Sequence, residues 1–150
     1  MANRPTAGAY DKIDTAESFL PRQHIMPLEA AATMIGTYAA VTSITQLFKV
    51  PANSNIKITG ATMKKTTGGT AAATATAWGL AQSLAGTGAL SVFGTLLFGT
   101  HADNSWHNFS VTTTDVPAGN TVELVGLVGT TTEESQVGSL LCIEYKEDWD

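Results

Sequence analysis

The chain has 150 residues, with 8 Lys and Arg against 13 Asp and Glu, which gives a formal net charge of −5. Only 14% of the residues are charged, where soluble domains average about 25%, and 23 Thr, 21 Ala and 14 Gly take their place. This composition excludes a basic nucleic-acid-binding protein, because no excess of Lys and Arg is present to neutralise phosphates. It also excludes a long helical bundle, and the length fits one compact domain.

The N-terminal residues differ from the rest and predict an arm, residues 1–23, in front of a main domain, residues 24–150. Asp14 and Glu17 have the spacing of a helix capping box, so we expect the arm to be extended or to contain one short helix. Such a helix is marginal on its own, and the arm either frays or becomes ordered against a neighbouring subunit. Its apolar residues, the candidate partner-binding side chains, are Tyr10, Ile13, Phe19 and Leu20.

From about residue 36 the pattern becomes that of β-strands. Residues 37–50 are rich in β-branched and aromatic side chains, a turn follows at 51–55, and residues 56–59 alternate between apolar and polar. Further strands are expected at 73–80, 92–98, 106–113, 121–128 and 138–146, whereas a helical pattern is limited to a weak stretch at 28–35. Seven or eight short strands separated by turn residues predict an all-β fold, an antiparallel β-sandwich with the connectivity of a jelly roll.

One segment is echoed within the chain. Residues 50–60 and 116–126 both begin with Val-Pro-Ala, continue through a short turn into an alternating strand, and end in Gly. Proline at this place fixes φ and removes a hydrogen-bond donor where strand pairing stops. The echo therefore predicts two strand–turn–strand units, and it fits the related halves of a jelly roll as well as a common way of starting a strand.

The C-terminal part of the chain is acidic. Residues 123–150 carry seven acids and one Lys, a balance of −6, whereas residues 1–122 balance at +1. Such an end is typically solvated, or it steers the domain towards a basic patch on a partner. Trp149, between two Asp residues, cannot be deeply buried in its own domain. It indicates either an anchor on a neighbouring subunit or a disordered end.

The sequence contains no motif that assembles an active site. The nearest cluster is His101, Asp103 and His107, which could ligate a divalent metal only if the loop brought them together, and no fourth ligand is near. Glu123 and Glu144 occupy outward positions of alternating strands and do not pair for acid–base catalysis. We therefore expect no enzyme activity, no metal and no cofactor.

Three further side chains have a predicted environment. Trp78 and Trp106 lie in or at the start of expected strands, and we expect both in the core. Cys142, the single cysteine, lies in an apolar run and is expected to be a buried, unreactive thiol. No secretory signal and no transmembrane helix are expected, which indicates synthesis in a reducing cytoplasm.

Two stretches carry a family resemblance. Residues 43–58 read SITQLFKVPANSNIKI and residues 67–73 read TGGTAAA. They resemble the opening strand pair and the following loop of small jelly-roll virion proteins of tailed bacteriophages, over about a quarter of the chain. Such proteins serve as head decoration, or cement, proteins and less often as tail or fibre components.

The resemblance implies a structural role in the virion. A decoration protein made in the host cytoplasm would sit on the capsid surface, bind the major capsid protein and itself as a homo-oligomer, for which we expect a trimer. Neither nucleic acid nor a membrane is an expected partner. Two alternatives remain open, namely a tail or fibre subunit and a carbohydrate-binding β-sandwich, and the second requires Trp78 or Trp106 to be exposed.

Overall fold

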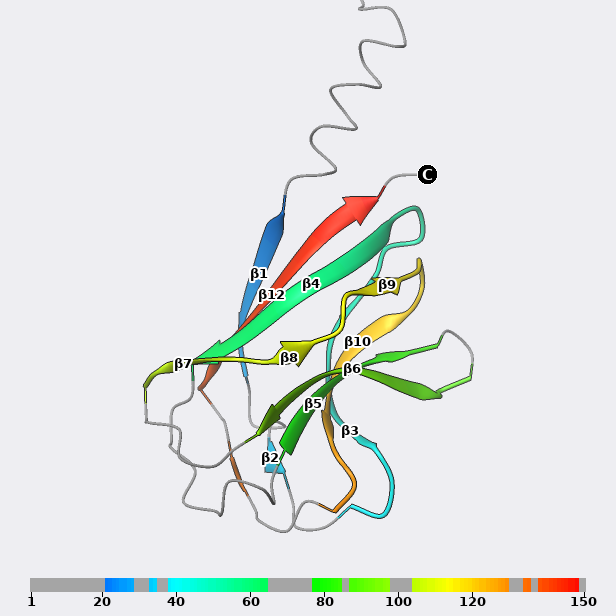
Figure 1. Ribbon diagram of the computed structural model, residues 1–150. Helices are drawn as coiled ribbons and strands as arrows, with labels where there is room; N and C mark the ends of the chain where they lie inside the picture. The colour runs from blue at the N-terminus through cyan, green and yellow to red at the C-terminus, as the bar shows by residue number, and fades with distance from the viewer. Residues whose placement is uncertain are drawn as a thin grey trace, which may run out of the picture.

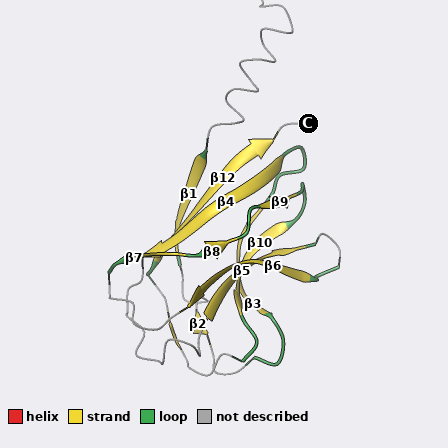
Figure 2. Ribbon diagram, in the orientation of Figure 1, coloured by secondary structure: helices red, strands yellow, loops and turns green. Residues whose placement is uncertain are grey.

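The computed structural model describes residues 21–28, 33–34, 38–64, 77–84, 87–97, 104–129, 134–135 and 138–148. All the regular secondary structure in these ranges is β-strand (Figures 1 and 2). The longer strands are β1 (Arg22–Pro27), β3 (Thr42–Lys49), β4 (Asn55–Lys64), β5 (Ala77–Ser83), β6 (Leu90–Leu97), β10 (Thr121–Gly126) and β12 (Leu140–Asp148). The short strands are β2 (Thr33–Met34), β7 (Trp106–Asn108), β8 (Ser110–Val111), β9 (Thr114–Val116) and β11 (Glu134–Ser135).

The strands form two antiparallel sheets that pack face to face. The first sheet has the order β1-β12-β4-β7, with β9 also paired to β4, and the second has the order β3-β10-β5-β6-β8. A separate pair joins β2 to β11. Figure 1 shows β1, β12 and β4 on one side of the molecule and β3, β5 and β6 on the other. The predicted all-β antiparallel sandwich is confirmed.

The pairing of the strands is nested along the chain. β1 pairs with β12, β3 with β10, β4 with β7 and β9, and β5 with β6. The first long strand thus pairs with the last, the second with the second-last, and the innermost pair is a hairpin. From β1 to β5 the long strands alternate between the two sheets: β1 and β4 lie in the first sheet, and β3 and β5 lie in the second. Both layers therefore contain strands from both halves of the sequence.

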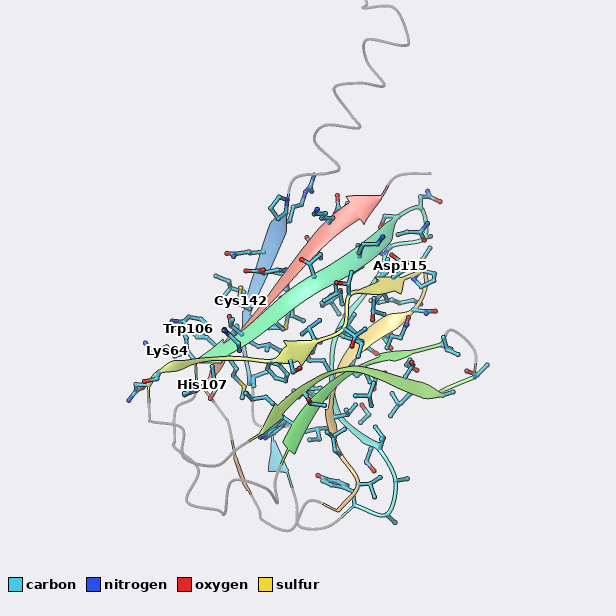
Figure 3. The ribbon with its side chains drawn as sticks, in the orientation of Figure 1. Lys64, Trp106, His107, Asp115 and Cys142 are labelled. Atoms are coloured by element: carbon cyan, nitrogen blue, oxygen red, sulfur yellow. The ribbon has the colours of Figure 1, made fainter. Side chains whose placement is uncertain are left out.

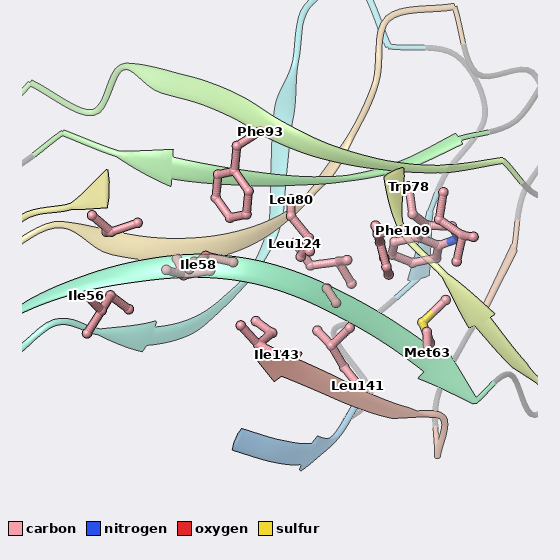
Figure 4. Packing of buried hydrophobic residues seen from close by; sticks show 14 of the residues in the cluster. Ile56, Ile58, Met63, Trp78, Leu80, Phe93, Phe109, Leu124, Leu141 and Ile143 are labelled. Atoms are coloured by element: carbon pink, nitrogen blue, oxygen red, sulfur yellow. The ribbon is translucent and has the colours of Figure 1, made fainter. Parts of the chain in front are cut away.

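The core lies between the two sheets and follows from the alternation of apolar and polar residues. In β4, Ile56 and Ile58 are buried whereas Lys57 between them is exposed. In β10, Val122 and Leu124 are buried in the same way. Figure 4 shows side chains of both layers meeting in the space between the sheets. Burial of one such side chain contributes about 1.5–3 kcal/mol.

The two Val-Pro-Ala segments lie together at one end of the sandwich. Val50 and Val116 are both buried, and each precedes a turn that leads into the next strand, as the echo predicts. The turns bind each other, because the Val50 N–H donates to the Asn120 carbonyl (2.9 Å) and the Gly119 N–H donates to the Val50 carbonyl (3.0 Å). The Ala118 N–H donates to Oδ1 of Asn55 (3.1 Å). These bonds fasten the starts of β4 and β10 to one another.

The start of the sandwich differs from the expected boundary. Arg22 and Gln23, which the sequence places in the arm, begin β1, and β1 is an edge strand of the first sheet. His24, the next residue, also lies within this strand, and the centroid of its ring is 5.7 Å from that of Phe48. The weak helical stretch at 28–35 contains β2, and residues 29–32 and 35 are not described. None of the described residues forms a helix able to cross a bilayer.

Candidate interaction surface

Several residues singled out in the sequence lie outside the described part of the chain. They are Tyr10, Ile13, Phe19 and Leu20 of the arm, Trp149 at the C-terminus, and His101 and Asp103 of the possible metal cluster. His107 is described: it lies in β7, half-buried and opposite Met63 of β4. Within the described ranges, no group of three or more His, Cys, Asp or Glu side chains is placed to hold a metal ion.

The two described tryptophans occupy opposite environments. Trp78 is fully buried in the core (0% exposed), which confirms the prediction. Trp106 is 49% exposed, so the prediction of a core position is wrong. The reason is the short strand β7: Trp106 and Asn108 point to its outer side, and the inward position falls on His107, opposite the buried Met63.

Trp106 belongs to a surface that crosses four of the five strands of the first sheet, β1, β12, β4 and β7, which we call the outer strip. Cross-strand neighbours in antiparallel pairs project on the same face. Register places Ile25, Cys142, Thr62 and Asn108 in one row, from β1 through β12 and β4 to β7. One flanking row is Pro27, Leu140, Lys64 and Trp106, and the other is Gln23, Glu144 and Gly60.

The outer strip faces away from the core. The residues that alternate with it, such as Leu141 and Met63, are fully buried between the sheets. Figure 3 shows Cys142, Lys64 and Trp106 gathered at the β7 end of the first sheet. Asp115, by contrast, lies towards the opposite end.

The central row of the strip has no charged residue. Ile25 is 58% exposed, although it is a large aliphatic side chain. Cys142 is only 6% exposed despite its outward direction. Burial raises the pKa of the Cys142 thiol above its ordinary value of 9.0; a hydrogen bond from the side chain of Thr62 acts in the opposite direction, and the charge of Glu144 adds to the rise. The prediction that the Cys142 thiol is buried is thus confirmed. The side chain lies on the outer face of the first sheet and not between the two sheets.

The flanking rows carry opposite charges. On one side, Glu144 accepts a hydrogen bond from Nε2 of Gln23 (3.1 Å), and its carboxylate lies over Gly60, where a Cβ would be 2.9 Å from Oε2. On the other side, Lys64 lies directly opposite Trp106. Both charged side chains are half-buried. The strip therefore has a neutral centre, an acid along one margin and a base along the other.

The rest of this sheet face is more polar. At the opposite end of β4, Nζ of Lys57 is 3.3 Å from the carboxylate of Asp115, and both side chains are exposed. Solvent-exposed pairs of this kind contribute about 0–1 kcal/mol and are screened by salt. Beyond the strip, the end of β4 that holds Lys57 therefore carries a hydrated, charged pair.

The outer face of the second sheet is different. The side chains of Val125 and Leu127 lie over Gly79, where a Cβ would be 2.7 Å from Val125 Cγ2, and Val125 is fully buried. Glu123, in its predicted outward position, is half-buried and accepts a hydrogen bond from Oγ1 of Thr121 (2.8 Å). Part of this face is thus covered by the chain itself, although Val92 of β6 is 36% exposed; on the first sheet, Ile25 and Trp106 are more exposed than Val92.

No family model matches the chain, and no curated protein matches it significantly.

Proposed function

We propose that this protein is a structural component of a tailed-phage head, a decoration protein that binds the assembled shell and stabilises it. The observation that carries the proposal is the outer strip, where an exposed Trp106 lies beside an uncharged row that ends in an exposed Ile25. Exposed apolar surface bordered by polar groups is typical of an interaction site. The nested strand pairing supports the jelly-roll part of the proposal, because a jelly roll is built from two Greek keys.

The partners in this proposal are the major capsid protein and further copies of the chain, as a trimer. The N-terminal arm supplies Tyr10, Ile13, Phe19 and Leu20 as contacts to a neighbouring subunit, and Trp149 supplies a second anchor. Aromatic side chains are frequent anchors at protein interfaces because they bury a large area with few rotatable bonds.

The mechanism is thermodynamic linkage and needs no catalytic group. A ligand that binds only the assembled shell stabilises that shell by RT ln(1 + [L]/Kd), which is about 2.7 kcal/mol when its concentration is 100 times Kd. Many copies on one shell add their contributions, so a modest contact per copy becomes a large effect on the particle.

The experiment is a thermal melt of heads stripped of this protein, with and without the purified chain added back. We expect the melting temperature of the heads to rise in proportion to the occupied sites, and the Trp106→Ala protein to produce a smaller rise. An unchanged melting temperature with natively folded protein at saturating concentration would refute the proposal. Labelling on the tail instead of the head, by electron microscopy, would assign the chain to a tail or fibre subunit.

A carbohydrate-binding module is the second candidate, and the exposure of Trp106 favours it. An exposed indole can stack on a sugar ring, and Asn108 and Thr62 place an amide and a hydroxyl on the same face. Trp78 cannot take this part, because it is fully buried. Binding on a glycan array that is lost in Trp106→Ala and retained in Leu84→Ala would select this function.

A further inference from the structure

We propose that the outer strip is an interface between two copies of this chain, related by a two-fold axis that lies in the strip close to its central row. The inference does not depend on the proposed function, because it follows from the arrangement of charges on one sheet face. A two-fold interface brings the same patch of both copies together, so the patch must be complementary to itself. The outer strip meets this requirement.

Self-complementarity comes from the positions of Lys64 and Glu144. Gly60 is opposite Glu144, and Lys64 lies four residues further along β4, so the two charges are separated by about 14 Å along the strands. Cys142 and Thr62 lie midway between them. A two-fold axis that passes near this midpoint places Lys64 of one copy over Glu144 of the second copy, and the reverse contact forms at the other margin.

The apolar side chains are arranged for the same pairing. When the two margins exchange, Trp106 of one copy comes to the margin that holds Gly60 in the second copy, beside the Glu144 carboxylate that lies over this glycine. Ile25 comes to the margin that holds Leu140. The centre, formed by the largely buried Cys142 and the half-buried Thr62, has no charge that must be desolvated.

The size of the strip limits the strength of the contact. Four strands at about 4.8 Å spacing and three rows cover roughly 19 by 14 Å, which is below the ~800 Å² per partner of a standard stable interface. The strip alone therefore gives a weak dimer, with a dissociation constant on the order of micromolar to millimolar. Such a contact operates where copies are concentrated, as between neighbours on one surface.

The first test uses engineered cysteines in a Cys142→Ser background. Lys64→Cys and Glu144→Cys proteins are mixed at high concentration and oxidised. We expect a disulfide-linked dimer in the mixture and little in either protein alone, because each introduced cysteine faces the other position in the partner. A matched control, Lys49→Cys on the second sheet, should not cross-link with either protein. Equal cross-linking in every sample, or none in the mixture, would overturn the proposal.

The second test uses charge reversal without a cross-link. Sedimentation at increasing concentration should show that Lys64→Glu or Glu144→Lys raises the apparent dissociation constant by at least about tenfold, and that the double reversal restores it. Far-UV circular dichroism and the melting temperature confirm that each variant is folded. A double variant no better than the single ones would overturn the proposal, as would a wild-type protein that stays monomeric at millimolar concentration. Glycan binding by that monomer through Trp106 would assign the strip to a sugar.

Discussion

Removal of one buried side chain from each sheet tests whether the two layers form a single cooperative core. Leu124 in β10 and Ile58 in β4 are both fully buried, and they occupy equivalent positions of the two Val-Pro-Ala segments. Truncation of either to alanine removes its apolar contacts and leaves a cavity between the sheets, which costs about 2–5 kcal/mol. Leu84→Ala is the matched control, because Leu84 is exposed and its truncation is expected to cost about 0.5 kcal/mol or less.

The assay is urea unfolding followed by tryptophan fluorescence, in which the fully buried Trp78 is the core reporter, and in parallel by far-UV circular dichroism. We expect coincident transitions and a similar loss of unfolding free energy for Leu124→Ala and Ile58→Ala. A loss of 3 kcal/mol corresponds to a fall in melting temperature of roughly 6–12 °C for a chain of this size. Losses no larger than that of Leu84→Ala, or separate transitions for the two probes, would refute a shared core.

Three further predictions concern single positions. Gly126→Ala should lower the unfolding free energy by about 1–3 kcal/mol in denaturant titrations, because a Cβ there would overlap the Tyr38 ring; Gly60→Ala should cost less, since its Cβ meets only the end of a flexible carboxylate. Because burial raises the pKa of the Cys142 thiol above 9.0, its contribution to stability is complete below that pH and is lost above it. The stability difference between wild type and Cys142→Ala should therefore shrink above pH 9; a constant difference from pH 7 to 11 would contradict this. Trp106→Ala should change the unfolding free energy by no more than about 0.5 kcal/mol while it weakens partner binding, and a large loss of stability would show that the indole belongs to the core.

The sandwich was predictable because alternation is a local property of the sequence. Ile56-Lys57-Ile58 and Val122-Glu123-Leu124 show which side chains face the core without any knowledge of their partners. β1 was missed because it is an edge strand on which only Met26 is half-buried and the rest is exposed. Such a strand leaves no alternating pattern, and its pairing with β12, more than 100 residues away, leaves no local signal.

The outer strip was not predictable for a different reason. Its rows exist only through the register between β1, β12, β4 and β7, and register cannot be obtained from composition or turn chemistry. The error at Trp106 has the same origin. The expected strand at 106–113 is divided into β7 and β8, and Phe109, between them, is buried. Trp106 and Phe109 are both aromatic, so the sequence alone does not show that Phe109 faces the core and Trp106 faces outward.

The most direct test of adhesion through the outer strip is hydroxyl-radical footprinting of the protein in dilute solution and in its native assembly. Trp106 is half-exposed in the isolated chain and Trp78 is fully buried, so Trp78 provides an internal background. Our account predicts that oxidation of Trp106 falls severalfold in the assembly, while that of Trp78 stays low in both states. Equal oxidation of Trp106 in both states would contradict it.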